Sequence, residues 1–415
     1  MHEDVDQDAV LRARTVLLGS GRPTRRQEVE ACRVLARVSP ATYLPRLSKA
    51  LIYLGFSDEY RKLGEAQLAL YEEAVEVARA VDPSDPQHTD LLMNALRWKQ
   101  HQLFELARRP EGLAVREEMA GLDRRTSGAD PDTPAGLGVE LWARGLAEEG
   151  RHREAAELFE KLVRRARPAG PSEGAFAWHL LEWTAEAEAA GLRQTALAAT
   201  GELVERERDQ LAAGRTGTRS LFFALLRLAE LHEGYARADE ASAALDEAAA
   251  LLAELAAHGE SKQWSGYQST YWVVLLGLSG RAAELPAPGR AAPPLGAHFH
   301  EWSPDLRQSY FAELPALRDA VEAAQDPGER FRLHRKLMIR SVLHAESGHR
   351  NRFFELLLPL FDEGVALARQ TADPAPVARA LLDRASALTA AQRFADALAD
   401  FQEALEVRRH KDPQR

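Results

Sequence analysis

Two histidines and a glutamate lie close together at His298, His300 and Glu301, with Phe299 between the histidines. Imidazole nitrogens and a carboxylate are ligands that zinc accepts, so this cluster could form part of a metal site. No further ligand group follows at an obvious spacing, and proline-rich sequence precedes the cluster. The sequence therefore favours a loop with exposed or helix-capping histidines, and a helical enzyme with a metal site near residues 285–303 stays an alternative.

A second group of residues offers charge rather than catalysis. The segment 329–352 is rich in basic residues, although the net charge of the chain is -10. A spacing of four residues places four of these side chains along one face of a predicted helix: Arg332, Lys336, Arg340 and His344. The sequence favours a solvated face whose charges pair with acidic side chains of a neighbouring repeat. The sharper hypothesis, which we carry forward, is a docking surface for an acidic partner segment.

Other sequence signals of enzymatic chemistry are missing. The chain has no Gly-Lys dipeptide and hence no Walker-type phosphate loop, and it has neither a Gly-x-Ser-x-Gly nor a His-Glu-x-x-His motif. Its single cysteine, Cys32, excludes an internal disulfide and a cysteine-based zinc site. We therefore expect a non-enzymatic protein without a cofactor or a bound metal.

Composition narrows the class of partner. The 415 residues are 45% hydrophobic and 28% charged, which is typical of a globular chain. Acidic residues outnumber basic ones by 63 to 53, which argues against general nucleic-acid binding. The longest apolar run, 271–278, is too short to span a bilayer, and the N-terminus lacks the order of a signal peptide. We expect a cytoplasmic protein, and its arginine bias suggests a bacterial source.

The elements that must position these residues are repeated helical hairpins. Near the C-terminus, large and small apolar residues follow a spacing of three and four on either side of a turn: Leu381, Ala385, Leu388, Ala397, Phe401 and Ala404. Copies of this template begin at residues 51, 96, 139, 180 and 225, which are 45, 43, 41 and 45 residues apart. Two further copies begin at Met338 and Leu381, 43 residues apart.

This spacing of large and small residues resembles the tetratricopeptide repeat (TPR), in a long-period form. The resemblance implies an all-α fold, namely a right-handed superhelical α-solenoid of TPR-like helical hairpins. The period exceeds the family's usual value of about 34 residues, and HEAT and armadillo repeats also have a period near this one. The Ala-x3-Phe pattern inside each copy favours the tetratricopeptide class.

The template divides the chain into four ranges. Residues 1–40 are predicted to form N-terminal helices that make a degenerate or capping hairpin. Residues 41–285 form a TPR-like solenoid segment, and 286–303 a Pro/Gly-rich break. Residues 304–410 form C-terminal TPR-like helices, with a kink or break expected at Pro315.

One aromatic helix, 262–278, lies outside the template. Its aromatic side chains are spaced to share a single face: Trp264, Tyr267, Tyr271 and Trp272. The sequence favours a buried face that covers the end of the first solenoid segment. The alternative is an exposed anchor for a partner.

The resemblance implies a mode of action but does not identify a partner. Solenoids present a long concave surface, so we expect an interaction scaffold, adaptor or regulatory subunit that holds a peptide or helix of another protein. The family's carboxylate clamp needs a Lys/Asn set, and here only Arg97 with His101 offers polar character at those positions. These two residues join the candidate partner-binding set. A peptide-sensing regulator is the other alternative, and the oligomeric state is left open.

Overall fold

The computed structural model describes residues 6–19, 21–126, 136–167, 174–260, 266–284, 291–346 and 353–411. Within these ranges the chain is helical, with short 3-10 turns and no strand. None of the helices described there is long and apolar enough to cross a membrane. The all-α prediction is confirmed for the described part of the chain.

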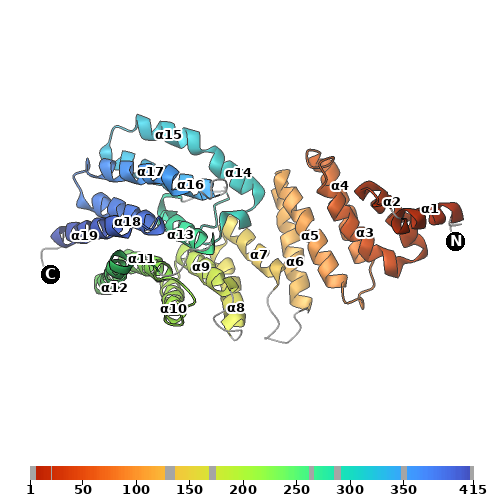
Figure 1. The fold of residues 1–415 in the computed structure, drawn as a ribbon, viewed down its shortest axis with the longest axis horizontal. Coiled ribbons are helices and arrows are strands. Elements are labelled where there is room, and N and C mark those ends of the chain that lie inside the picture. Colours follow the sequence, from red (N-terminus) through yellow and green to blue (C-terminus); the bar gives the residue numbers. More distant parts are fainter. Residues whose placement is uncertain are drawn as a thin grey trace. The chain divides into compact units, whose positions relative to one another are not determined.

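The chain divides into two compact units. Unit 1 contains Met1–Gly145 and Ser303–Asp305, and unit 2 contains Leu146–Trp302 and Leu306–Arg415. The boundary falls within helix α7 (Leu137–Glu148). The helices of unit 1 that precede it are α1 (Gln7–Leu18), α2 (Arg25–Val38), α3 (Pro40–Gly55), α4 (Gly64–Arg79), α5 (His88–Glu105) and α6 (Arg109–Thr126) (Figure 1).

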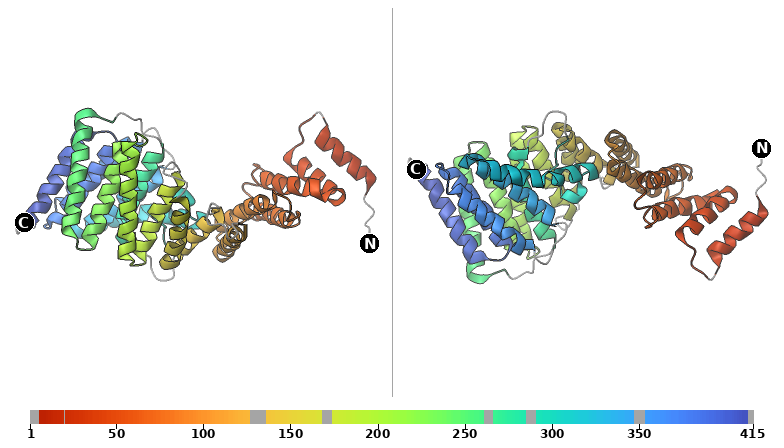
Figure 2. Two further views of the ribbon diagram at one scale, coloured as in Figure 1. Left: turned by 90° about the horizontal axis from the view of Figure 1, so that it is seen from below. Right: turned by 90° about the horizontal axis from the view of Figure 1, so that it is seen from above.

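Within unit 1, each helix packs against the next one along the chain (Figure 2). The two predicted N-terminal helices are present as α1 and α2, and α2 starts with a capping box between Thr24 and Gln27. The apolar residues of α2 to α6 form one continuous core. Unit 1 is therefore an array in which neighbouring helical hairpins bury each other's apolar faces.

Unit 2 contains the remaining helices, except that Pro304 and Asp305, at the start of one of them, belong to unit 1. They are α8 (His152–Ala166), α9 (Gly174–Ala189), α10 (Arg193–Ala212), α11 (Thr218–Gly234), α12 (Ala238–His258), α13 (Gly266–Ser279), η2 (Arg281–Glu284), η3 (Phe299–Glu301), α14 (Pro304–Ala312), α15 (Leu314–Ala323), α16 (Pro327–Glu346), α17 (Phe353–Ala368), α18 (Pro374–Ala390) and α19 (Phe394–Lys411). The break expected at Pro315 is confirmed, since α14 ends at Ala312 and α15 begins at Leu314.

The last two helices of unit 2 pack against helices from the middle of the same unit. Helix α19 packs on α12, and α18 contacts α11. Of the expected break at 286–303, the described residues 291–302 belong to unit 2 and Ser303 belongs to unit 1. Residues 286–290 lie outside the described residues. The rest of the break packs inward, because Leu295, Phe299 and Trp302 are buried and Gly296 lies against Ala185 of α9.

The turns between paired helices repeat the same geometry. In five copies the residue eleven positions after the template start has a positive φ of 56° to 73°. These residues are Ala107, Gly150, Gly191, Ala236 and Gln392. In each turn the next residue's N–H donates to the carbonyl five residues earlier at 2.8 Å, which is the longer bond of a Schellman motif. The recurrence of this turn at one register confirms the repeat.

Small residues lie where the template places two helices in close contact. A Cβ atom on Gly55 would lie 2.6 Å from the Tyr71 ring, so α3 and α4 approach closely only because this residue is glycine. The small positions Ala155, Ala241 and Ala397 are all buried. The helices on which template copies begin, α3, α5, α7, α9, α11, α16 and α18, are called first helices below.

Candidate functional site

The predicted basic stripe lies on α16, but its side chains do not share one exposed face. Arg332 and His344 are exposed, whereas Lys336 is half-buried and Arg340 is only 4% exposed. The Arg340 guanidinium binds both carboxylate oxygens of Glu284, at 2.8 and 2.6 Å. Lys336 Nζ lies 3.2 Å from the same carboxylate. The expectation of a single exposed stripe is therefore wrong for Lys336 and Arg340.

The surroundings of Arg340 explain why a buried arginine is stable there. Its guanidinium lies over the Tyr310 ring at 4.1 Å and also donates to Glu313 at 2.8 Å. Burial alone would lower the pKa of Arg340, but hydrogen bonds to Glu284 and the other nearby groups raise it above its ordinary value. Burial, with Glu284 alongside, raises the pKa of Tyr310 well above its ordinary value. Arg340 is thus a charged side chain bound within unit 2.

The other predicted pair lies on α5 in unit 1. Arg97 is exposed, with its guanidinium 5.7 Å from the centre of the Trp98 ring. His101 is half-buried, and its ring packs against Trp98 and lies 3.7 Å from Glu105. Trp98 in turn packs edge-on against Phe56, the residue that directly follows α3. The structure brings Arg97 and His101 to the same aromatic side chain, and their role in partner binding stays a prediction.

The histidine cluster at η3 has a local structural role. His298 caps η3, because its Nδ1 accepts the His300 backbone N–H at 3.4 Å. Its Nε2 lies 3.1 Å from a carboxylate oxygen of Glu346. The expected capping role of a histidine is confirmed. Among the described residues, no three His, Cys, Asp or Glu side chains are grouped so that they could hold a metal ion.

Helix α13 lies at the centre of unit 2 (Figure 1). It contacts α11, α16 and α18, which are first helices, and its Tyr271 ring packs against Trp178 of α9. Every residue from Tyr271 to Leu278 is buried. The interpretation of Tyr271 and Trp272 as core residues is confirmed, but they fill the interior of the unit and do not cover its end. Trp264 and the side chain of Tyr267 lie outside what the structure describes.

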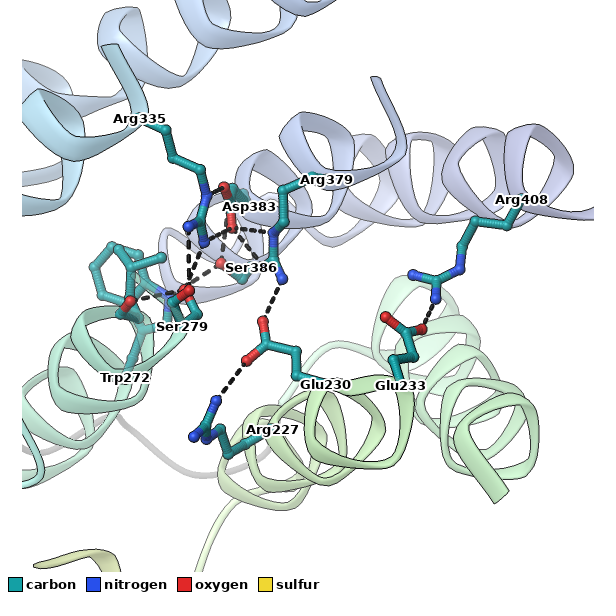
Figure 3. A network of polar contacts seen from close by, with 11 residues as sticks. Arg227, Glu230, Glu233, Trp272, Ser279, Arg335, Arg379, Asp383, Ser386 and Arg408 are labelled. Atoms are coloured by element: carbon teal, nitrogen blue, oxygen red, sulfur yellow. Dashed lines mark hydrogen bonds and ion pairs between the residues drawn. The ribbon is translucent and has the colours of Figure 1, made fainter. Parts of the chain in front are cut away.

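A network of ion pairs surrounds the C-terminal end of α13 (Figure 3). Arg335 of α16 donates to the Ser279 hydroxyl at 2.7 Å and to the Ser279 carbonyl at 3.1 Å. The same guanidinium binds Asp383 of α18 at 2.7 Å. Positive charge stabilises the end of a helix, where carbonyl groups have no partner within the helix. Arg335 therefore ties α13 to both α16 and α18.

The network continues from α18 to α11. Arg379 of α18 binds Asp383 and also reaches Glu230 of α11. Glu230 lies 3.2 Å from Arg227, which also contacts Glu188 of α9. Burial would raise the pKa of Asp383, but Arg335 and then Arg379 outweigh it and hold the pKa below its ordinary value. Arginines and carboxylates therefore alternate in this network from α16 through α18 and α11 to α9, and their charges neutralise each other.

Two small cavities and one larger cavity lie beside this network. A cavity of about 30 Å³ lies beside Trp272, Ser279 and Arg379, and another of about 20 Å³ lies beside Glu233 and Arg408. Each of these two is large enough for about one water molecule. A larger cavity of about 300 Å³ lies between α12 and α19, where Arg408 contacts Glu233. The arrangement is suited to holding helices together.

Sequence reasoning identified α16 as an important helix but missed its partners. The acidic residues that bind its cations, Glu284 and Asp383, lie 56 and 48 residues away in the sequence. Helical spacing relates residues only within one helix. One feature of the sequence does indicate that 266–279 is a buried helix, namely that it contains no charged residue. A helix that is apolar all round is normally buried.

Comparisons with known proteins found solved structures that resemble part of this chain. No protein-family model matches the chain, and no curated protein matches it. The crystal structure of BtubC (BKLC) from P. vanneervenii is similar over 58% of this chain and 93% of its own, at 15% identity and a TM-score of 0.42. A putative kinesin light chain from Podosopora anserina, described as having nearly identical TPR-like repeats, is similar over 51% and 98%, at 17% identity and a TM-score of 0.40.

Both TM-scores are low, so the fold assignment rests on this chain's own helices. Those helices pack in consecutive pairs, five of their turns share one geometry, and small residues occupy the contacts where the template requires them. By these features the chain is an all-α solenoid of tetratricopeptide-like helical hairpins.

Proposed function

We propose that the chain is a non-enzymatic protein–protein interaction scaffold, and that the first helices of unit 1 hold an acidic peptide or helix of a partner. One observation carries the proposal. In unit 2 the first helices are covered by α13, whereas in unit 1 α3 and α5 contact each other and keep an exposed face. That exposed face is the surface on which repeat arrays of this kind can hold another chain.

The exposed face of α3 and α5 has a composition suited to an acidic partner. Tyr53 is 59% exposed, and Lys49 and Arg97 are also exposed. Aromatic side chains and arginines supply much of the binding energy at protein interfaces. Cations on a chain of net charge -10 create a local field that attracts acidic segments. A peptide-sensing regulator would use the same surface.

The test compares two double variants in the full-length protein. Tyr53→Ala with Arg97→Glu changes the proposed surface, and Arg332→Glu with His344→Glu changes the two exposed residues of the basic stripe on α16. Partners that co-purify from the native host are identified by mass spectrometry, and their affinity for each variant is then measured. We expect the first variant to lose at least about tenfold in affinity, because it removes an aromatic anchor and reverses a charge.

The outcomes separate the two surfaces. If the unit 1 variant binds as wild type and the α16 variant loses the partner, the exposed part of the basic stripe is the binding surface and the proposal for unit 1 fails. If both variants bind as wild type, neither surface is used. Circular dichroism at 222 nm controls for loss of helix in either variant.

A further inference from the structure

Helix α13 differs from the other helices of unit 2 in its sequence and its place. It carries no charged residue, although 28% of the whole chain is charged. It lies outside the repeat template and is followed by η2 rather than by the second helix of a hairpin. It contacts first helices on several sides, at α9, α11, α16 and α18. This is the surface that a solenoid offers to a ligand.

Two kinds of contact hold α13 on that surface. The apolar contact is made by Tyr271 to Leu278, and Trp272 packs against Phe361 of α17 at a ring distance of 6.4 Å. A methyl group on Gly280, directly after the helix, would lie 2.6 Å from Ile339 Cδ1, so α16 approaches the C-terminal end of α13 closely. Burial of Tyr271 to Leu278 among these neighbours selects an apolar helix of about four turns.

The polar contact lies just beyond the C-terminal end of α13. Arg335 donates to the last carbonyl of the helix, at Ser279. Five residues further on, Glu284 receives Arg340, Lys336 and the Tyr310 hydroxyl, the last at 3.1 Å. The cations on α16 therefore recognise a helix end followed by a carboxylate.

We propose that the inner surface of unit 2 is a binding groove for an uncharged apolar helix followed by a carboxylate, and that α13 with η2 is its resident occupant. A partner segment of the same chemistry binds there by replacing the resident. The cations of α16 do bind a carboxylate, but in the structure that carboxylate belongs to the same chain. It lies in η2, which also carries Arg281, whose guanidinium lies 3.1 Å from Glu186 of α9. This groove is separate from the surface proposed for unit 1, and either can be present without the other.

The test weakens the resident without changing the groove. Glu284→Gln keeps the shape of the side chain and removes the charge that Arg340 and Lys336 bind. The probe is a fluorescent synthetic peptide of residues 266–284 with a lysine-rich solubility tag at its amino end, added to the full-length protein. A hydrogen bond to a charged group is strong enough that its loss changes an equilibrium by about tenfold to a hundredfold. We expect the peptide to bind the E284Q protein at least about tenfold more tightly than it binds wild type.

Two controls make the result specific. Glu313→Gln removes another carboxylate partner of Arg340, but Glu313 lies outside α13 and η2, so E313Q should bind the peptide as wild type does. A peptide with Gln in place of the glutamate at position 284 should bind the E284Q protein at least about tenfold more weakly than the native peptide.

Hydrogen exchange of the full-length protein distinguishes an occupant from a core helix. If α13 is an occupant, its amides exchange faster in E284Q than in wild type by about tenfold to a hundredfold, while those of α11 stay unchanged. Exchange of α13 and α11 at one common rate in both proteins would show an inseparable core and overturn the proposal. Failure of the native peptide to bind E284Q would overturn it as well.

Discussion

Glu207 of α10 offers a direct test of the electrostatics of unit 2. Its side chain is only 5% exposed. Burial raises its pKa from 4.5 to about 7, although Arg206 and a hydrogen bond with Thr216 partly oppose the shift. A carboxyl whose pKa is higher in the folded than in the unfolded state binds more protons when folded. The contribution of Glu207 to the free energy of unfolding must therefore fall as pH rises from about 4.5 to about 7.

The size of the effect follows from the shift. At about 1.4 kcal/mol per pKa unit, Glu207 costs the folded state about 3 kcal/mol above pH 7 and close to nothing near pH 4.5. Glu207→Gln keeps the shape and a hydrogen-bonding group for Thr216 without the charge. We expect E207Q to match wild type near pH 4.5 and to be more stable by about 3 kcal/mol at pH 8.

The assay is urea unfolding of both proteins at pH 4.5, 6 and 8. Taking the difference between variant and wild type cancels the titration of all other groups. Glu205→Gln is the matched control, because Glu205 lies on the same helix with a side chain that is 69% exposed. A difference between E207Q and wild type that stays constant across the three pH values would refute the claim that Glu207 is buried and uncharged at neutral pH.

Two further predictions concern the repeat itself. Gln392→Gly and Ala236→Gly place glycine at turn positions with φ of 61° and 59°. Each should raise the free energy of unfolding, measured by urea titration, by about 0.5–1 kcal/mol. The reason is that glycine relieves about 1–2 kcal/mol of backbone strain, which exceeds its entropy cost. Tryptophan in place of a buried alanine overpacks a helix contact, so we expect each of three variants to lose about 1–3 kcal/mol or more of the free energy of unfolding: Ala155→Trp, Ala241→Trp and Ala397→Trp. The control, Ala253→Trp at an exposed position of α12, should be nearly neutral. Wild-type melting temperatures for all three buried variants would contradict the proposed register.

The fold was predictable because its determinants are local and repeated. A large residue at the template start, a small residue where two helices touch and a break between them recur along the chain, so each copy supports the assignment of the others. Ala397 and Phe401, which anchor the last copy, are both fully buried. The turn register was harder to see, because two of the five left-handed positions hold glycine while the others hold alanine or glutamine. At the alanine and glutamine positions, the backbone hydrogen bonds of the turn hold the residue at a positive φ although its side chain disfavours it.

The site was only partly predictable because its contacts join distant parts of the chain. Glu230 and Arg379 are 149 residues apart and meet only because the last hairpin returns to α11. Periodicity shows which residues share a face of one helix, but it does not show which other helix lies opposite. Arg340 was wrongly expected to lie in an exposed stripe, since nothing near α16 in the sequence indicates that Glu284 binds it.

The charge pattern of the chain has a physical reason once α13 is placed. A helix with no charged side chain can be buried on every side, but the carbonyl groups at its C-terminal end still require donors. Arg335 supplies them at Ser279, and the cation also neutralises Asp383. One turn further along α16, Arg340 does the same for Glu284. A chain that is acidic overall therefore gathers cations on α16 because that helix faces the polar end of a buried apolar one.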